Sequence, residues 1–439
     1  MKKILIVLLV LIVITVTFET ASAATTIPGG PFASSITIQN LGDAQAAVSV
    51  RYVTSSGTTA FTSDHSIPVG DVLSIYVPAE AVADGEYSVV LSSNQPISAI
   101  SNFSDTDSGA SYAGAEVGSP TWFVPGVYDN YYSNYSEVYV QNVAATAQNI
   151  TLNVYAPGSA TPVYTNTKTA VPSLASVNWG LKDLPELNSN VPYSAKVTAT
   201  GNIVVMTNYY GMGSIAPQLY SYNGFPNGAT KFYLPSITNF YYGWRSSINI
   251  QNVSADVANV TITYSNGTSK DYEIQPNSGI LIYIPVEGLP SGKAGLLGAT
   301  VTSDQNVAVV VNQSNDYNRG ASYTAISAPT TKVAVPLLMK KYYNESSSLT
   351  CQNVSTTATV MTATFSDIAT PITSGSIEPN EIWSVYLPDP QFAFPDKYLG
   401  SAVITATQNI ACVVQSNFEH APYNTQQMDA HKAYTGINQ

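Results

Sequence analysis

A recurring pair of residues, Gln-Asn, divides this chain into units of nearly equal length. The pair stands at 39–40, 141–142, 251–252 and 352–353, in steps of 102, 110 and 101 residues. Each pair ends a stretch in which apolar and polar residues alternate, as Ile248, Asn249 and Ile250 do. A fixed step of about 100 residues indicates a tandem array of modules and disfavours a continuous β-solenoid, whose repeats are about 20–45 residues long.

Two further markers keep the same register. The first is a proline that precedes an aromatic strand, at Pro68, Pro172, Pro276 and Pro379. The second is a short polar segment that ends at Ile97, Ile203, Val307 and Ile410. Because apolar alternation flanks each polar segment, we expect a hairpin turn there.

The stretches between the markers predict an all-β chain. Each unit offers about seven short runs rich in β-branched and aromatic residues, and no run shows a sustained helical period. Seven short strands in about 100 residues are typical of a two-sheet sandwich. We therefore predict four tandem immunoglobulin-like antiparallel β-sandwich domains in a row. We expect the four domains at 24–117, 118–226, 227–328 and 329–420. A C-terminal connector tail follows at 421–439.

The N-terminus predicts export. Lys2 and Lys3 precede an apolar run at 4–16, and Ala21-Ser22-Ala23 follows it. This order is typical of a secretory signal peptide at 1–23, cleaved after Ala23. The alternative is an uncleaved membrane anchor, but the run is shorter than the roughly 20 residues that span a bilayer. We expect a mature chain without a membrane span, located outside the cell or at its surface.

Composition and motifs argue against nucleic-acid binding and catalysis. The formal net charge is −12 and only 10% of residues are charged, whereas nucleic-acid binding needs a basic surface. The three histidines, His65, His420 and His431, have no metal-ligand spacing. No nucleophile elbow, phosphate loop or dinucleotide fingerprint occurs. We expect no enzyme, no cofactor and no metal.

The two cysteines occupy matched positions of the repeat. Cys351 is in the register of Val140 and Ile250, and Cys412 in that of Val205 and Val309. Two cysteines in one exported domain predict a disulfide. We expect its Cα atoms about 5.5 Å apart, in a bridge like the inter-sheet disulfide of antibody domains. The alternative is two buried free thiols.

Nine Asn-x-Ser/Thr sequons are candidate glycan acceptors in an exported chain. They could also arise from a composition rich in Asn, Ser and Thr. The nine are Asn102, Asn134, Asn149, Asn252, Asn259, Asn266, Asn312, Asn344 and Asn353.

Aromatic clusters follow a proline near the start of three units, at Pro125, Pro235 and Pro336. They suit packing at the junctions between units, and they also suit contacts between subunits or stacking on sugars. The candidate interface aromatics are Tyr131, Tyr132, Tyr241, Tyr242, Trp244, Tyr342 and Tyr343.

The two ends of the array do not match. Each unit continues into a tyrosine-bearing connector, and the last connector, 432–436, has no following unit. The first unit lacks the aromatic cluster. We therefore predict head-to-tail joining, in which the tail of one molecule adds to the first unit of the next. The alternative is a frayed C-terminus.

Three stretches within residues 220–345 are distinctive: Y-N-G-F-P-N-G-A-T-K-F-Y-L-P, Y-Y-G-W-R-S-S-I-N-I-Q-N-V and V-A-V-V-V-N-Q-S-N. In these stretches the chain resembles a tandem repeat found in secreted surface proteins of filamentous bacteria. The resemblance implies an extracellular, cell-surface role without known catalysis.

These observations favour a secreted, self-associating structural subunit of an extracellular assembly such as a filament, sheath or surface layer. The alternative is a cell-surface adhesin or a carbohydrate-binding repeat array, with glycans as partners.

Overall fold

The chain is built almost entirely of antiparallel strands. The computed structural model describes residues 10–13, 27, 30–105, 108–212, 217–316, 319–418 and 431–438. Within them, the only helices are four 3-10 turns of three residues each. The all-β prediction is confirmed.

Four successive groups of strands correspond to the four units of the repeat. The first comprises β1 (Val10–Val13), β2 (Ala33–Asn40), β3 (Ala46–Thr54), β4 (Thr59–Ile67), β5 (Val72–Tyr76), η1 (Val77–Ala79), β6 (Glu86–Ser93), β7 (Ile97–Ser104) and β8 (Gly109–Ala113). The second comprises β9 (Ser119–Tyr128), β10 (Asn134–Asn142), β11 (Gln148–Tyr155), β12 (Tyr164–Val171), β13 (Ser176–Gly180), β14 (Pro192–Met212) and β15 (Pro217–Asn223).

The third and fourth groups repeat this order. The third comprises β16 (Ala229–Tyr241), β17 (Trp244–Asn252), β18 (Ala258–Tyr264), β19 (Ser269–Ile274), β20 (Gly279–Tyr283), η2 (Ile284–Val286), η3 (Gly292–Ala294), β21 (Leu296–Ser314) and β22 (Gly320–Thr324). The fourth comprises β23 (Thr330–Lys340), β24 (Glu345–Asn353), β25 (Met361–Phe365), β26 (Ile372–Thr373), β27 (Ile382–Tyr386), η4 (Pro390–Phe392), β28 (Tyr398–Phe418), β29 (Lys432–Thr435) and β30 (Ile437–Asn438).

One long strand runs through each of the last three units. In the second unit, the first half of β14 pairs with β11 and β9, and its second half pairs with β10 and β15. β21 and β28 do the same, whereas the first unit divides this strand into β6 and β7. The strand thus joins two groups of strands into one continuous sheet, unlike the separate sheets of an immunoglobulin domain.

The predicted hairpin turns before Ile203, Val307 and Ile410 are therefore wrong. Each of these segments lies inside an unbroken strand. Polar residues such as Thr200 and Asn202 are exposed where β14 changes pairing partner from β11 to β10. They mark this change of partner, and the chain does not reverse there.

The asparagine of each Gln-Asn pair is a buried clamp. Asn142 donates its Nδ2 hydrogens to the carbonyl oxygens of Thr146 and Val171, at 2.8 and 2.9 Å, and its Oδ1 accepts the amide hydrogen of Ala144 at 2.9 Å. Asn40, Asn252 and Asn353 repeat these bonds in their own units, and none of the four asparagines is more than 1% exposed. The clamp ties the turn after one strand to the end of another, which explains the recurrence of the pair.

Substitution of one clamp should be costly. Asn252→Ala leaves the carbonyls of Asp256 and Ile274 and the amide of Ser254 without their partner. We expect the free energy of unfolding to fall by about 3 kcal/mol, because each unpaired buried group costs about 1–3 kcal/mol. Urea unfolding measures it. Asn266→Ala, at an exposed turn of the same unit, is the control, with an expected change below about 0.5 kcal/mol. Equal losses in both variants would contradict the clamp.

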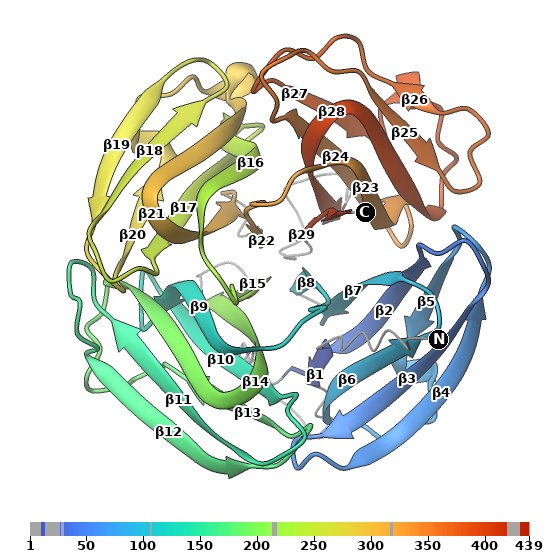
Figure 1. Ribbon diagram of the computed structural model, residues 1–439. Coiled ribbons are helices and arrows are strands. Elements are labelled where there is room, and N and C mark those ends of the chain that lie inside the picture. The colour runs from blue at the N-terminus through green and yellow to red at the C-terminus, as the bar shows by residue number, and fades with distance from the viewer. Residues whose placement is uncertain are drawn as a thin grey trace.

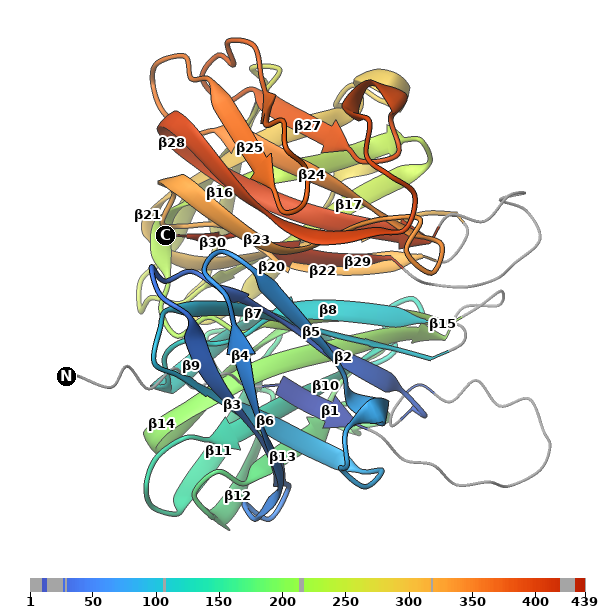
Figure 2. The same ribbon diagram turned by 90° about the vertical axis from the view of Figure 1, so that its right-hand side faces the viewer.

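The four units lie around a common axis and form a closed ring (Figure 1). Their connector strands β8, β15, β22 and β29 occupy the centre, where β15 contacts β8 and β22, and β29 contacts β22 and β8. Figure 2 shows β8, β22 and β29 lying along the axis. The connector strands run in the same direction, because hydrogen bonds join the starts of β15 and β22, the ends of β15 and β8, and the ends of β29 and β22. Asn223 at the end of β15 donates to the carbonyl of Ala113 at the end of β8, at 2.6 Å. Thr435 at the end of β29 donates to the carbonyl of Thr324 at the end of β22, at 2.7 Å.

In three of the four units, a hydrophobic side chain from the following unit around the ring belongs to the core. Val310 of the third unit belongs to the core of the second, and Val413 of the fourth belongs to the core of the third. Ile100 of the first unit, which is fully buried, belongs to the core of the fourth. The first unit is therefore the neighbour of the fourth, and the predicted arrangement in a row is wrong.

The described part of the predicted tail is used within the same chain. Lys432–Thr435 pairs with β28, and Ile437–Asn438 pairs with β23. The fourth connector meets the first unit of its own chain, so it is not the free end that head-to-tail joining requires. No helix in the described ranges is long and apolar enough to span a bilayer.

Candidate functional site: the tyrosine tips

Three hairpin turns place a tyrosine in an unusual backbone conformation. Their central residue pairs are Tyr132-Ser133, Tyr242-Gly243 and Tyr343-Asn344, and we call these turns the tyrosine tips. All six residues have positive φ, with values of 48°, 48° and 47° for the three tyrosines. Both central residues of a type I′ turn need positive φ, which Asn and Gly adopt most easily. At the second position Gly243 and Asn344 follow this preference and Ser133 does not, whereas the first position is tyrosine each time.

The tip tyrosines are also the most exposed aromatic side chains of the described chain. Tyr132, Tyr242 and Tyr343 are 76%, 71% and 82% exposed. Each ring meets that of the preceding tyrosine nearly edge to face, with centroids 4.8–5.0 Å apart. Such strained positions cost about 1–3 kcal/mol each and concentrate at functional sites.

The three tips lie on one face of the ring. Each tip precedes a residue that pairs with the end of its unit's long strand: Asn134 pairs with Gly211, Arg245 with Ser314, and Glu345 with Phe418. After the end of each long strand, the chain enters the connector strand of that unit. Because the connector strands run in the same direction, the ends of the long strands and the adjoining tips share one face. Within the described residues of the first unit, no such tip precedes the corresponding strand, which begins at Ala33.

The residues preceding the tips are partly buried. Burial, and next the neighbouring tip tyrosine, raise the pKa of Tyr131 and Tyr241 above the usual range. Tyr342 is half-buried too. Trp244 packs on His431 of the next unit, with ring centroids 4.0 Å apart, and therefore serves the junction between units.

The sequence pattern shows the aromatic clusters but does not separate these roles. The signal that could separate them is the two-residue loop, whose first residue is tyrosine where Asn or Gly is favoured.

The tips are close to charged groups. Arg245 forms an ion pair with Asp316, and its guanidinium lies 5.7 Å from the centre of the Phe240 ring. At the third tip, Lys341 pairs with Asp396 at 3.2 Å. The tip face thus combines exposed aromatic rings with cations and carboxylates, which suits contact with a polar macromolecular surface.

The nine sequons fall into different environments. Asn149, Asn259, Asn266 and Asn344 are exposed, and Asn134 is half-buried. The others are buried, at 7% or less: Asn102, Asn252, Asn312 and Asn353. Asn252 and Asn353 are clamp residues whose Nδ2 atoms are occupied, so the exposed four remain the best-placed candidates.

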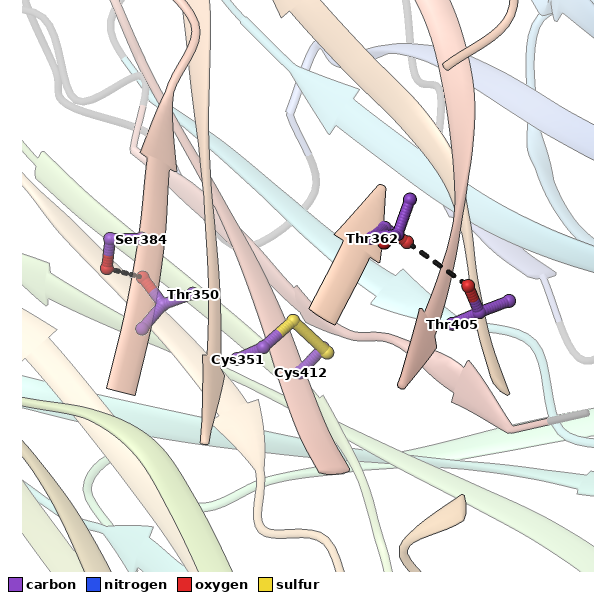
Figure 3. The surroundings of a disulfide bond; sticks show 6 residues. All are labelled: Thr350, Cys351, Thr362, Ser384, Thr405 and Cys412. Atoms are coloured by element: carbon purple, nitrogen blue, oxygen red, sulfur yellow. Dashed lines mark hydrogen bonds between the residues drawn. A yellow bond between two sulfur atoms is a disulfide. The ribbon is translucent and has the colours of Figure 1, made fainter. Parts of the chain in front are cut away.

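The predicted disulfide is present, but it lies within one sheet. Cys351 and Cys412 are bonded, and they face each other on the neighbouring strands β24 and β28 (Figure 3). Their Cα atoms are 4.1 Å apart, closer than the 5.5 Å expected, because directly paired strand residues approach more closely than residues on two packed sheets. The antibody-like inter-sheet bridge was the wrong interpretation. The register itself holds: Val140 pairs with Val205, and Ile250 pairs with Val309.

The two described histidines, His65 and His431, lie in separate places. Among the described residues, no three His, Cys, Asp or Glu side chains are grouped to hold a metal ion. His65 contacts Ser63, at 2.9 Å, and His420 lies outside the described residues. His431 is buried; this burial, and next the nearby Arg319, lower its pKa to about 3. It therefore remains neutral at ordinary pH.

No protein-family model matches the chain, and no curated protein is similar to it in sequence. A solved structure of Thermotoga maritima 1070 shares 18% identity and covers 25% of this chain and 94% of its own, with a TM-score of 0.22. The Anabaena sensory rhodopsin transducer shares 19% identity over 20% of this chain and 94% of its own, with a TM-score of 0.17. A tetra-tandem repeat in the extending region of a large adhesion protein shares 12% identity over 91% of this chain and 93% of its own, with a TM-score of 0.12. These TM-scores are too low to establish a shared fold.

Proposed function

We propose that this protein is an exported, non-catalytic structural subunit of an extracellular assembly, and that the tyrosine tips are its contacts with neighbouring subunits. The observation that carries the proposal is the repeated placement of an exposed tyrosine at positive φ. Asn or Gly would form the same turns more favourably. A side chain kept at a cost to stability, on one face and in three units, is best explained by binding.

We also infer that each unit is a two-layer β-sandwich module, immunoglobulin-like in its layers but with one strand shared between them. The alternation of buried and exposed residues along strands such as Ala258–Tyr264 supports this. The signal-peptide pattern at 1–23 supports export. Subunit contacts through the tip face replace the predicted joining through the tail, because the tail is paired within its own chain.

The test separates association from folding. In the triple variant Tyr132→Asn, Tyr242→Asn and Tyr343→Asn, each turn receives a residue that tolerates positive φ. We expect the free energy of unfolding to rise by about 1 kcal/mol per site. We also expect assembly, measured by analytical ultracentrifugation and electron microscopy of the purified protein, to weaken at least tenfold.

The matched control removes three other exposed tyrosines. Tyr76, Tyr283 and Tyr386 are 58%, 39% and 44% exposed and occupy equivalent strand ends, and none of them has positive φ. Their substitution by Asn should leave assembly unchanged. If both triple variants assemble like the unaltered protein, the tips are not the contact.

The second candidate is a multivalent adhesin that binds carbohydrate. It is favoured by the edge-to-face pairs of tyrosines, because an exposed ring face can stack on a sugar. A glycan array distinguishes the two functions. Glycan binding by a monomeric protein that the tip variant loses would support the adhesin, and concentration-dependent assembly without glycan binding would support the structural subunit.

A further inference from the structure

The first unit fills one of its strand positions in a different way from the others. In the last three units, the opening strands β9, β16 and β23 pair with the first half of the long strand. In the first unit, β1 takes this place beside β6. The register is the same throughout: Val10 pairs with Val89, as Val124 pairs with Ala195, Leu234 with Ala299 and Val335 with Ala402.

This position requires an apolar strand. Val124, Leu234 and Val335 are fully buried in their own units. In the first unit, Val89 and Leu91 of β6 are likewise buried core residues. A strand beside β6 also pairs backbone groups that would otherwise be unpaired at a sheet edge.

The occupant of this position in the first unit belongs to the predicted signal peptide. Val10–Val13 lies within the apolar run at 4–16, before the predicted cleavage after Ala23. In the other units the opening strand leads directly through a tip into the next strand. Removal of 1–23 would therefore leave the opening strands of these units in place. Export would therefore remove an opening strand from the first unit alone.

We propose that export opens the edge of β6 and that this edge then accepts an extended segment of another polypeptide as a replacement strand. The inference rests on the proposed export. The segment has the pattern of this chain's own opening strands, with polar and apolar residues followed by an apolar residue and proline, as in 229–235 and 330–336. Backbone pairing with β6 supplies the attachment, and the apolar residue at the Val10 register supplies the selectivity.

The test uses the exported protein and a synthetic peptide with the sequence of 229–235, A-T-K-F-Y-L-P. Mass spectrometry first establishes the N-terminus, and circular dichroism establishes that the protein is folded. We expect one peptide to bind per chain by fluorescence anisotropy. Binding should be at least tenfold weaker to chain that retains 1–23, and at least tenfold weaker for the peptide carrying Leu234→Asp.

A second variant tests whether the peptide occupies the proposed position. Residues 330–336 are fused through a flexible linker to the N-terminus of the exported protein, so that this segment can occupy the position in cis. Peptide binding should then be lost, and the midpoint of thermal unfolding should rise. The proposal is overturned if the folded exported protein does not bind the peptide, or if binding is equal after the fusion. It is also overturned if the exported protein retains 1–23. The measurement is made on the tip variant at low concentration, so its result does not depend on assembly through the tips.

Discussion

Removal of residues 432–439 is expected to lower the free energy of unfolding by more than about 5 kcal/mol. Tyr434 is only 4% exposed, and a buried tyrosine contributes about 4–6 kcal/mol through its area alone. Its hydroxyl group also donates a hydrogen bond to the carbonyl of Leu337. Lys432 pairs with Glu345 at 2.7 Å, and loss of the lysine leaves a largely buried carboxylate unpaired. The ring then lacks one of its four central strands.

Urea unfolding and limited proteolysis measure this effect. A chain that lacks only 437–439 is the control: it keeps β29 and loses β30, whose residues are half-buried or exposed, so we expect a loss below about 2 kcal/mol. Addition of a peptide with the sequence of 431–439 should restore stability in part. If the shorter chain unfolds like the complete one, the fourth connector does not close the ring.

The same truncation distinguishes ring closure from joining through the tail. If the tail joined two molecules, its removal would change stability only at concentrations at which molecules associate. In the closed ring, the contacts of Tyr434 and Thr435 are made within one chain. The loss should therefore be the same at any protein concentration.

The repeat and its register could be predicted from the sequence because they depend on local alternation. Cys351 and Cys412 were matched to Val140 and Val205 by pattern alone, and both pairs are cross-strand neighbours. Alternation shows which residues face a core, but not whether two such residues lie on one sheet or on two. This is why the disulfide was predicted correctly and its place within one sheet was not.

Ring closure could not be predicted in this way, because it depends on the angle between successive units. That angle is set by contacts such as the hydrogen bond that the side-chain Nε2 of Gln251 donates to the carbonyl of Ala195, which join residues far apart in the sequence. The last connector was wrongly interpreted as a free end that joins two molecules. It pairs with β28 of its own unit and contacts β8 of the first unit within one chain.

The tips illustrate a different limit. Tyr131 and Tyr132 are adjacent and chemically identical, and only the backbone conformation distinguishes the half-buried residue from the exposed one. Residue type gives little warning, because tyrosine rarely occupies the first position of a type I′ turn.

Removal of the disulfide is expected to cost about 4 kcal/mol, and the cost should be confined to the fourth unit and its junctions. Cys351 and Cys412 are 61 residues apart, and a bridge across this length stabilises by about 4 kcal/mol when it restricts the unfolded chain. The suitable variant is Cys351→Val with Cys412→Val, because Val140 and Val205 fill the same paired positions in the second unit. Calorimetry of this variant and of the reduced protein should show the same early transition.

The matched control places a disulfide where the third unit has none. Ile250 and Val309 are paired as the two cysteines are, so Ile250→Cys with Val309→Cys should stabilise that unit by a similar amount under oxidising conditions. The native bridge also supports the end of the chain, because the amide of Gly436 donates to the carbonyl of Cys412 at 2.9 Å. Loss of the bridge should therefore increase proteolysis after residue 431 before it affects the second unit. If the valine variant unfolds within about 1 kcal/mol of the native protein, the bridge is not what stabilises the unit that closes the ring.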